Sequence, residues 1–138
     1  MSWKENLKDL GAGDITILSE DGATITFVIV DAPILYETEY KGNPQKKVCW
    51  PVWYEDGFTL LLLGARATRR LMQYEKKSDT KAFTVTRKGI EGDTNAVYKV
   101  TVSDDDKLAA ALFAAAKAEY KPEMLTEAKA AVEEMITR

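Results

Sequence analysis

The sequence predicts a mainly β fold with helices, and two observations support this fold class. Between residues 14 and 102, short runs rich in β-branched and aromatic residues alternate with turn-forming residues. Only residues 65–77 within that range change to a helical spacing, and two further helical stretches follow residue 103. We set aside a doubly wound α/β sheet, because that fold needs helices between its strands throughout.

The first half of the chain predicts two hairpins. Residues 14–18 and 23–30 are β-branched runs, and the turn between them contains Asp21-Gly22, a pair that favours tight reversals. Residues 46–55 and 58–63 are two more strands, joined by a turn that contains Asp56-Gly57. Each pair is expected to be antiparallel.

The second half predicts one helix, two strands and two final helices. Residues 65–77 place apolar side chains on one side of a helix. The strands at residues 82–88 and 96–102 flank a glycine-bearing loop. Asp104–Asp106 are expected to start a helix that ends near Tyr120, and Pro122 suits the first turn of a helix that runs nearly to the last residue.

This element order matches a five-stranded OB-type barrel, which has a helix between its third and fourth strands. We expect one domain over residues 1–138, with the barrel at about 13–102 and a helical extension at about 103–138. No repeat or linker composition divides the chain. The two C-terminal helices are expected to cover the barrel, with pairing of subunits into a homo-oligomer as the alternative.

The composition excludes several function classes. The chain has no histidine and one cysteine, Cys49, so it has neither an internal disulfide, nor the usual zinc ligands, nor an imidazole for nucleophilic catalysis. We therefore expect no enzyme, no metal and no cofactor; carboxylate-held magnesium is the strongest chemical rival. No long apolar run or signal peptide is present, which predicts a cytoplasmic protein without membrane contact.

Charge is unevenly distributed along the chain. Residues 1–40 carry two basic and eight acidic side chains, residues 41–88 eleven and four, and residues 89–138 six and ten. The overall net charge is −3, yet the middle of the chain is strongly basic. A basic segment in a β-rich fold is consistent with phosphate contacts, although solvated faces also produce such blocks.

OB-type barrels bind ligands on strands two and three and on the two loops that frame them. Residues 46–55 correspond to strand two of such a barrel. Alternation along them puts Trp50 and Tyr54 on one face, which we expect to be core, and Trp53 on the other, where it is the better stacking candidate. Positive charge comes from the first framing loop, at residues 40–47, and from Arg87 and Lys88 next to the second. The arginines of the predicted helix are either a second contact strip or a solvated face. The candidate nucleic-acid-binding residues are Tyr40, Lys41, Lys46, Lys47, Trp50, Trp53, Tyr54, Arg66, Arg70, Arg87 and Lys88.

Three motifs between residues 48 and 102 carry a family resemblance. They are Trp50-Pro51-Val52, the helix at residues 65–71, and Phe83–Gly89 followed by Gly92-Asp93-Thr94 and Tyr98. In these motifs the chain resembles the single-stranded DNA-binding proteins of tailed bacteriophages that use an OB fold. The resemblance implies protection of single strands during phage replication or recombination in the host cytoplasm. The helical end of this chain departs from the flexible acidic tail of many such proteins.

These observations predict non-sequence-specific binding of single-stranded DNA, with RNA as an open alternative. Loop lysines and arginines would contact phosphates, and strand aromatics would stack on bases. The rival prediction is an OB-type protein–protein interaction module, in which Trp53 and Tyr40 anchor a partner protein. Salt dependence separates the two, because phosphate contacts weaken steeply with added salt.

Overall fold

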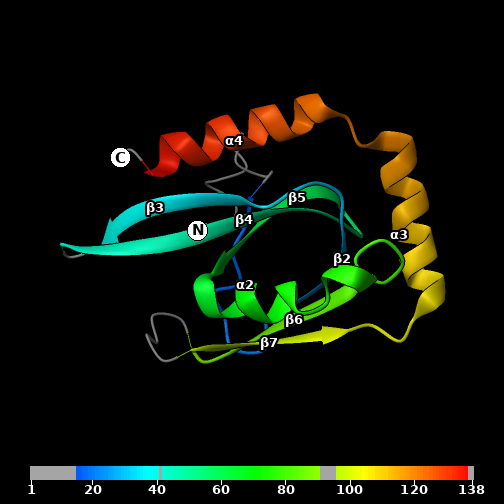
Figure 1. The fold of residues 1–138 in the computed structure, drawn as a ribbon, viewed down its shortest axis with the longest axis horizontal. Helices are drawn as coiled ribbons and strands as arrows, with labels where there is room; N and C mark the ends of the chain where they lie inside the picture. Colours follow the sequence, from blue (N-terminus) through cyan, green and yellow to red (C-terminus); the bar gives the residue numbers. More distant parts are fainter. Residues whose placement is uncertain (1–14, 41, 91–95, 137–138) are drawn as a thin grey trace.

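The computed structural model describes residues 15–40, 42–90 and 96–136, and in this part of the chain seven strands form one sheet (Figure 1). The sheet order is β1-β5-β4-β2-β6-β7, and β3 also pairs with β4. The strands are β1 (Ile15–Thr16), β2 (Thr24–Ile29), β3 (Ile34–Tyr40), β4 (Asn43–Tyr54), β5 (Gly57–Gly64), β6 (Phe83–Lys88) and β7 (Val97–Val102). The predicted mainly β fold with helices is confirmed. The described residues form an open sheet, because its end strands β1 and β7 do not pair with each other.

The predicted hairpin between residues 14–18 and 23–30 is wrong. β1 pairs in parallel with β5, while β2 pairs antiparallel with β4 and β6. The turn between them contacts β6 instead, because the Gly22 amide donates to the Arg87 carbonyl at 2.8 Å. Ile15 and Leu18 explain the separation, since they are buried in different apolar clusters on the two sides of the sheet.

β3 and the first half of β4 form a hairpin where the sequence predicted a loop. Tyr40 pairs with Asn43 around Gly42, whose φ of +79° suits glycine. Glu37 pairs with Lys46 across the two strands, so opposite charges support the register. We call residues 34–40 and 42–49 the arm; Figure 1 shows it projecting at one end of the molecule.

The remaining predicted strands and the first predicted helix are present. β4 and β5 form the predicted hairpin, in which Tyr54 pairs with Gly57. β6 and β7 pair antiparallel along their full length. Helix α2 (Ala65–Met72) is shorter than predicted, and a 3-10 turn, η2 (Glu75–Lys77), follows it. Ala67 and Leu71 of α2 pack on the main core, the apolar cluster that contains Phe27, Trp50 and Phe83.

The two C-terminal helices, α3 (Asp106–Glu119) and α4 (Pro122–Ile136), cover the sheet on the side opposite α2 (Figure 1). α3 places Ala109, Leu112 and Ala116 against Val28 and Trp53. α4 places a second set of apolar residues over β1, β4 and β5; this cluster contains Ile15, Cys49, Leu60, Ala128 and Val132. The expectation that these helices cover the strands is confirmed.

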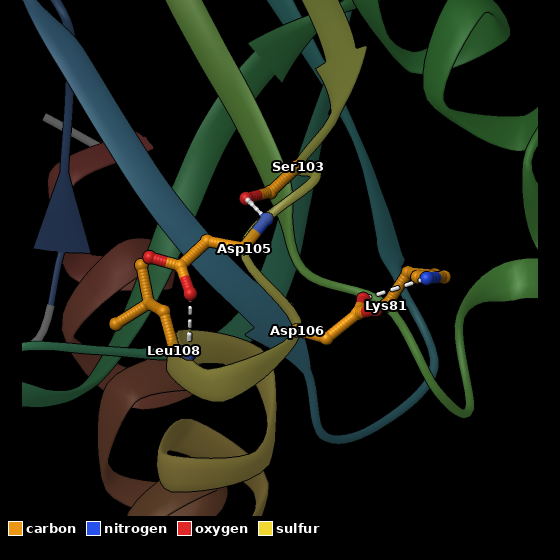
Figure 2. Close-up of polar contacts among 5 residues, drawn as sticks. All are labelled: Lys81, Ser103, Asp105, Asp106 and Leu108. Carbon is orange, nitrogen blue, oxygen red and sulfur yellow. Dashed lines mark hydrogen bonds and ion pairs between the residues drawn. The ribbon is translucent and has the colours of Figure 1, made fainter.

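The start of α3 is held by polar contacts, which Figure 2 shows. The Asp105 carboxylate accepts a hydrogen bond from the Leu108 amide at 3.0 Å and so caps the helix. The Asp105 amide in turn donates to the Ser103 hydroxyl at 3.2 Å. Lys81, just before β6, forms an ion pair with Asp106 at 2.6 Å. These contacts confirm that Asp104–Asp106 begin a helix.

Candidate nucleic-acid interface

Both central tryptophans of β4 lie in the protein interior. Trp50 and Trp53 are each 5% exposed. The predicted division of faces is confirmed, because Trp50 and Tyr54 belong to the main core while Trp53 lies on the other face. The prediction that Trp53 is open for stacking is wrong, because α3 packs over it, and Trp50 donates its indole N–H to the Thr68 hydroxyl at 3.2 Å inside the core. Tyr54 is half-buried against the same core.

The C-terminal helices cover much of the outer face of β4 and β5, the face on which OB-type barrels bind ligands. Cys49 and Leu60 are fully buried beneath α4. Burial raises the pKa of the Cys49 thiol to about 11, so the thiol stays protonated near neutral pH. Tyr36 lies at the edge of the same cluster, and burial is the largest cause that raises its pKa. The sequence predicted that the C-terminal helices cover the strands, but alternation within β4 could not show that they cover this face.

The lysines predicted to frame one binding site lie on separate parts of the sheet. Lys46 is exposed and Lys47 half-buried, and both lie on strand β4 of the arm, as the strand predicted for residues 46–55 requires. Tyr40 ends β3, and Lys41 lies outside the described residues. Lys88 is exposed at the end of β6.

Arg87 has a structural role and is not available to a ligand. Its side chain is 8% exposed. The guanidinium donates to the Gly89 carbonyl at 3.0 Å, the Ile90 carbonyl at 2.8 Å and the Tyr98 hydroxyl at 3.0 Å. Tyr98 in turn donates to the Leu18 carbonyl at 3.2 Å. The Arg87…Tyr98 part of the resemblance motif therefore fixes the turn after β6, and the prediction of Arg87 as a phosphate contact is wrong.

Arg66 and Arg70 are exposed and lie four residues apart, which places them on one flank of α2. Arg70 donates to the Tyr98 backbone carbonyl at 2.7 Å, so this flank borders β7. The pairing of Lys47 with Gly64 places the arm beside the first turn of α2. The predicted cations of the arm and of the helix thus come from neighbouring elements.

Sequence reasoning missed a partly exposed face on β2, β6 and β7. Residues Phe27, Val85 and Val100 point into the core, so the alternate residues point outward. The outward side chains include two threonine pairs, Thr24 with Thr86 and Thr26 with Thr84, whose hydroxyl oxygens are 2.9 Å apart in both pairs. We call Thr24, Thr26, Thr84, Thr86, Lys88 and Lys99 the threonine face. The repeated Thr-x-Thr spacing of residues 24–26 and 84–86 was the signal in the sequence.

The cations of the threonine face lie at one end of it. Lys99 pairs with Thr86, and Lys88 pairs with Val97, so the two lysines stand on adjacent strands. Both are exposed. Val97 is 46% exposed, and Ile90 in the neighbouring turn is 71% exposed. The face therefore combines hydroxyl groups, two positive charges and accessible apolar surface at its end.

Over the described ranges, no three histidine, cysteine, aspartate or glutamate side chains gather as a metal site requires. None of the helices in the same ranges is both long and apolar enough to cross a bilayer. Comparisons of the chain with protein-family models, with curated proteins and with solved structures found no match.

Proposed function

We propose that this protein is an OB-type barrel that binds single-stranded DNA without sequence preference. Support for the barrel comes from the strand connections. β2 and β3 both pair with β4, so they correspond to two parts of one bent strand, and β1 is an addition. Five strands then remain in the predicted order, with α2 between the third and the fourth. Binding would protect single strands during replication or recombination and involves no chemical step.

The observation that carries the proposal is the threonine face. Each threonine pair shares one hydroxyl hydrogen, which leaves a second hydrogen and free lone pairs for a ligand. Threonine hydroxyls, lysines and arginines are among the groups that contact phosphate and sugar oxygens in DNA complexes. Lys88 and Lys99 supply the charge at the end of this face, on which Thr24 is exposed and the other three threonines are half-buried.

A path of cations continues from the threonine face. It runs from Lys99 on β7 to Arg70 and Arg66 on α2, and then to Lys46 on the arm. Lys47 is two residues from Cys49 and so points to the other face of β4. Binding through such a path depends on phosphates and not on base identity, which agrees with a protein that accepts any sequence. Bases would contact the exposed apolar surface of Ile90 and Val97. Because Trp50 and Trp53 are buried, binding should change the emission of these two tryptophans little.

The test is a titration of the protein into labelled oligothymidine and into a duplex of equal length, followed by fluorescence anisotropy at 50 and 200 mM salt. We expect preference for the single strand. We also expect log affinity to fall with log salt at a slope of about −0.7 for each phosphate contacted. An affinity that is equal for both nucleic acids, or unaffected by salt, would contradict the proposal.

The second candidate function is an OB-type protein interaction module. Ile90 and Val97 favour it, since two exposed apolar side chains at one turn are suited to contact a partner protein. The same titration separates the two functions. Absence of binding to either nucleic acid at 50 mM salt would reject the first and leave the second.

A further inference from the structure

A hollow outside the threonine face lies between the β4–β5 turn and the corner where α3 meets α4. Its volume is about 430 Å³. The floor is apolar and the rim is acidic: the floor contains Trp53, Phe58 and Met124, and the rim contains Asp56, Glu119 and Glu127. The proposed function leaves this hollow unexplained.

The corner that forms one wall is fixed in place. The Tyr120 ring lies 5.3 Å from the Phe58 ring between centroids, and its hydroxyl donates to the Asp31 carboxylate at 2.9 Å. Within the described residues, none of the three rim carboxylates forms an ion pair. An apolar floor below unpaired negative charge suits a group with an apolar stem and a positive end.

The chain itself carries a surface of matching chemistry. Arg69 and Met72 are three residues apart on the flank of α2 next to the one that carries Arg66 and Arg70. Arg69 is exposed and Met72 is 55% exposed, so a positive charge and an apolar surface are both accessible on this flank. A positive charge beside an apolar side chain complements the acidic rim and the apolar floor of the hollow.

We propose that the Arg69–Met72 flank of α2 docks in the hollow of a second copy of this protein. A copy cannot fill its own hollow, because α2 packs on the main core while Trp53 and the hollow lie on the other face of β4. Figure 1 shows α2 and the α3–α4 corner on different sides of the sheet. The contact joins two different surfaces, so copies associate head to tail.

The choice of a second copy as the partner rests on the proposed function. A single strand has a direction, so copies bound to it in one way all have the same orientation. Neighbouring copies then meet through two different surfaces, as a head-to-tail contact requires. Arg70 remains free for phosphates in this arrangement, because it lies about 100° around the helix from Arg69 and farther from Met72.

The test is sedimentation velocity of the full chain without DNA at 50 mM salt over a range of concentrations. The variants are Arg69→Glu and Glu127→Lys, and the matched controls are Lys76→Glu near α2 and Glu123→Lys on α4, all at exposed positions. We expect the wild type and both controls to associate as concentration rises. Each variant should associate at least tenfold more weakly, and an equimolar mixture of the two should regain association because their charges are exchanged.

Three outcomes would overturn the inference: a wild type that stays monomeric, variants that associate as the wild type does, or controls that lose association equally. A second measurement keeps the two proposals apart. Binding to an oligothymidine too short for two copies depends on the proposed function alone. If the short strand is bound and the protein does not associate, then the docking fails while the function stands. If the protein associates as expected but binds no strand, then the function fails while the docking stands.

Discussion

Arg87 shows how a residue chosen as a ligand contact can be a structural one. Its guanidinium is buried and donates to two carbonyls just after β6 and to the Tyr98 hydroxyl on β7. A planar guanidinium meets this geometry, whereas a lysine ammonium is a point charge on a flexible stem. The turn that places Lys88 at the end of the threonine face therefore depends on Arg87.

Replacing Arg87 with lysine should lower the free energy of unfolding by about 1.5–3 kcal/mol, because hydrogen bonds from a buried charged group are lost. Urea denaturation measures this change. Arg66→Lys is the matched control at an exposed position, and it should leave the midpoint unchanged. Equal midpoints for Arg87→Lys and the wild type would show that the three hydrogen bonds contribute little.

The sequence predicted correctly which face of a strand each residue lies on, because alternation determines that. It did not predict which face is buried under another element. The period of two correctly separated Trp50 from Trp53. It could not show that Trp53 is buried, because the covering residues, Ala109, Leu112 and Ala116, belong to a helix that is distant in sequence. The threonine face followed the same alternation and could have been predicted.

Among the elements, α4 decides whether the outer face of β4 and β5 is accessible. Ala128 is fully buried and Val132 nearly so, and both pack on Cys49. The small Ala128 side chain leaves no room for a larger polar group at this contact. Cys49 is consequently a natural reporter for the position of α4.

Ala128→Asp should therefore expose Cys49 by dislodging α4, because an unpaired buried carboxylate is strongly unfavourable. We expect the thiol to react with a disulfide reagent at pH 8 at least tenfold faster than in the wild type. Ala130→Asp changes an exposed position of the same helix and should label as slowly as the wild type. Rapid labelling of the wild type would contradict the buried position of Cys49.

Element prediction succeeded for local pairings and failed for distant ones. The β4–β5 and β6–β7 hairpins are joined by short connections with turn-forming residues, which the sequence displays. The parallel pairing of β1 with β5 joins residues some 45 positions apart, and no local pattern marks it. β3 was missed because the charged residues and Pro44 around its turn are typical of a loop.

At the scale of the whole molecule, several buried groups link stability to alkaline pH. Burial, a hydrogen bond to Asp31 and the charge of Asp31 raise the pKa of Tyr120 to about 12, from an ordinary value of 10.0. Burial is also the largest cause that raises the pKa of Tyr54, Tyr36 and Cys49. In each case the folded state holds its proton to higher pH than the unfolded chain does.

Stability should therefore be complete below about pH 9, the ordinary pKa of the Cys49 thiol, and fall as pH rises towards about 12, because the unfolded chain ionises first. Tyr120→Phe removes one of these groups, so its stability should fall less steeply over that range. Urea denaturation at pH 9, 10 and 11 measures the slope. A slope equal to that of the wild type would contradict the contribution assigned to Tyr120.

The central claim is that single-stranded DNA binds at the threonine face, and the most direct test is to locate the binding site with variants. Anisotropy titrations with oligothymidine at 50 mM salt should compare the wild type with Lys88→Gln/Lys99→Gln on the threonine face. The control is Lys107→Gln/Lys117→Gln on α3, which removes the same charge from two exposed positions. We expect the first pair to lose at least tenfold in affinity and to have a shallower salt slope, and the control to lose less than twofold. Equal losses in the two pairs would contradict binding at the threonine face.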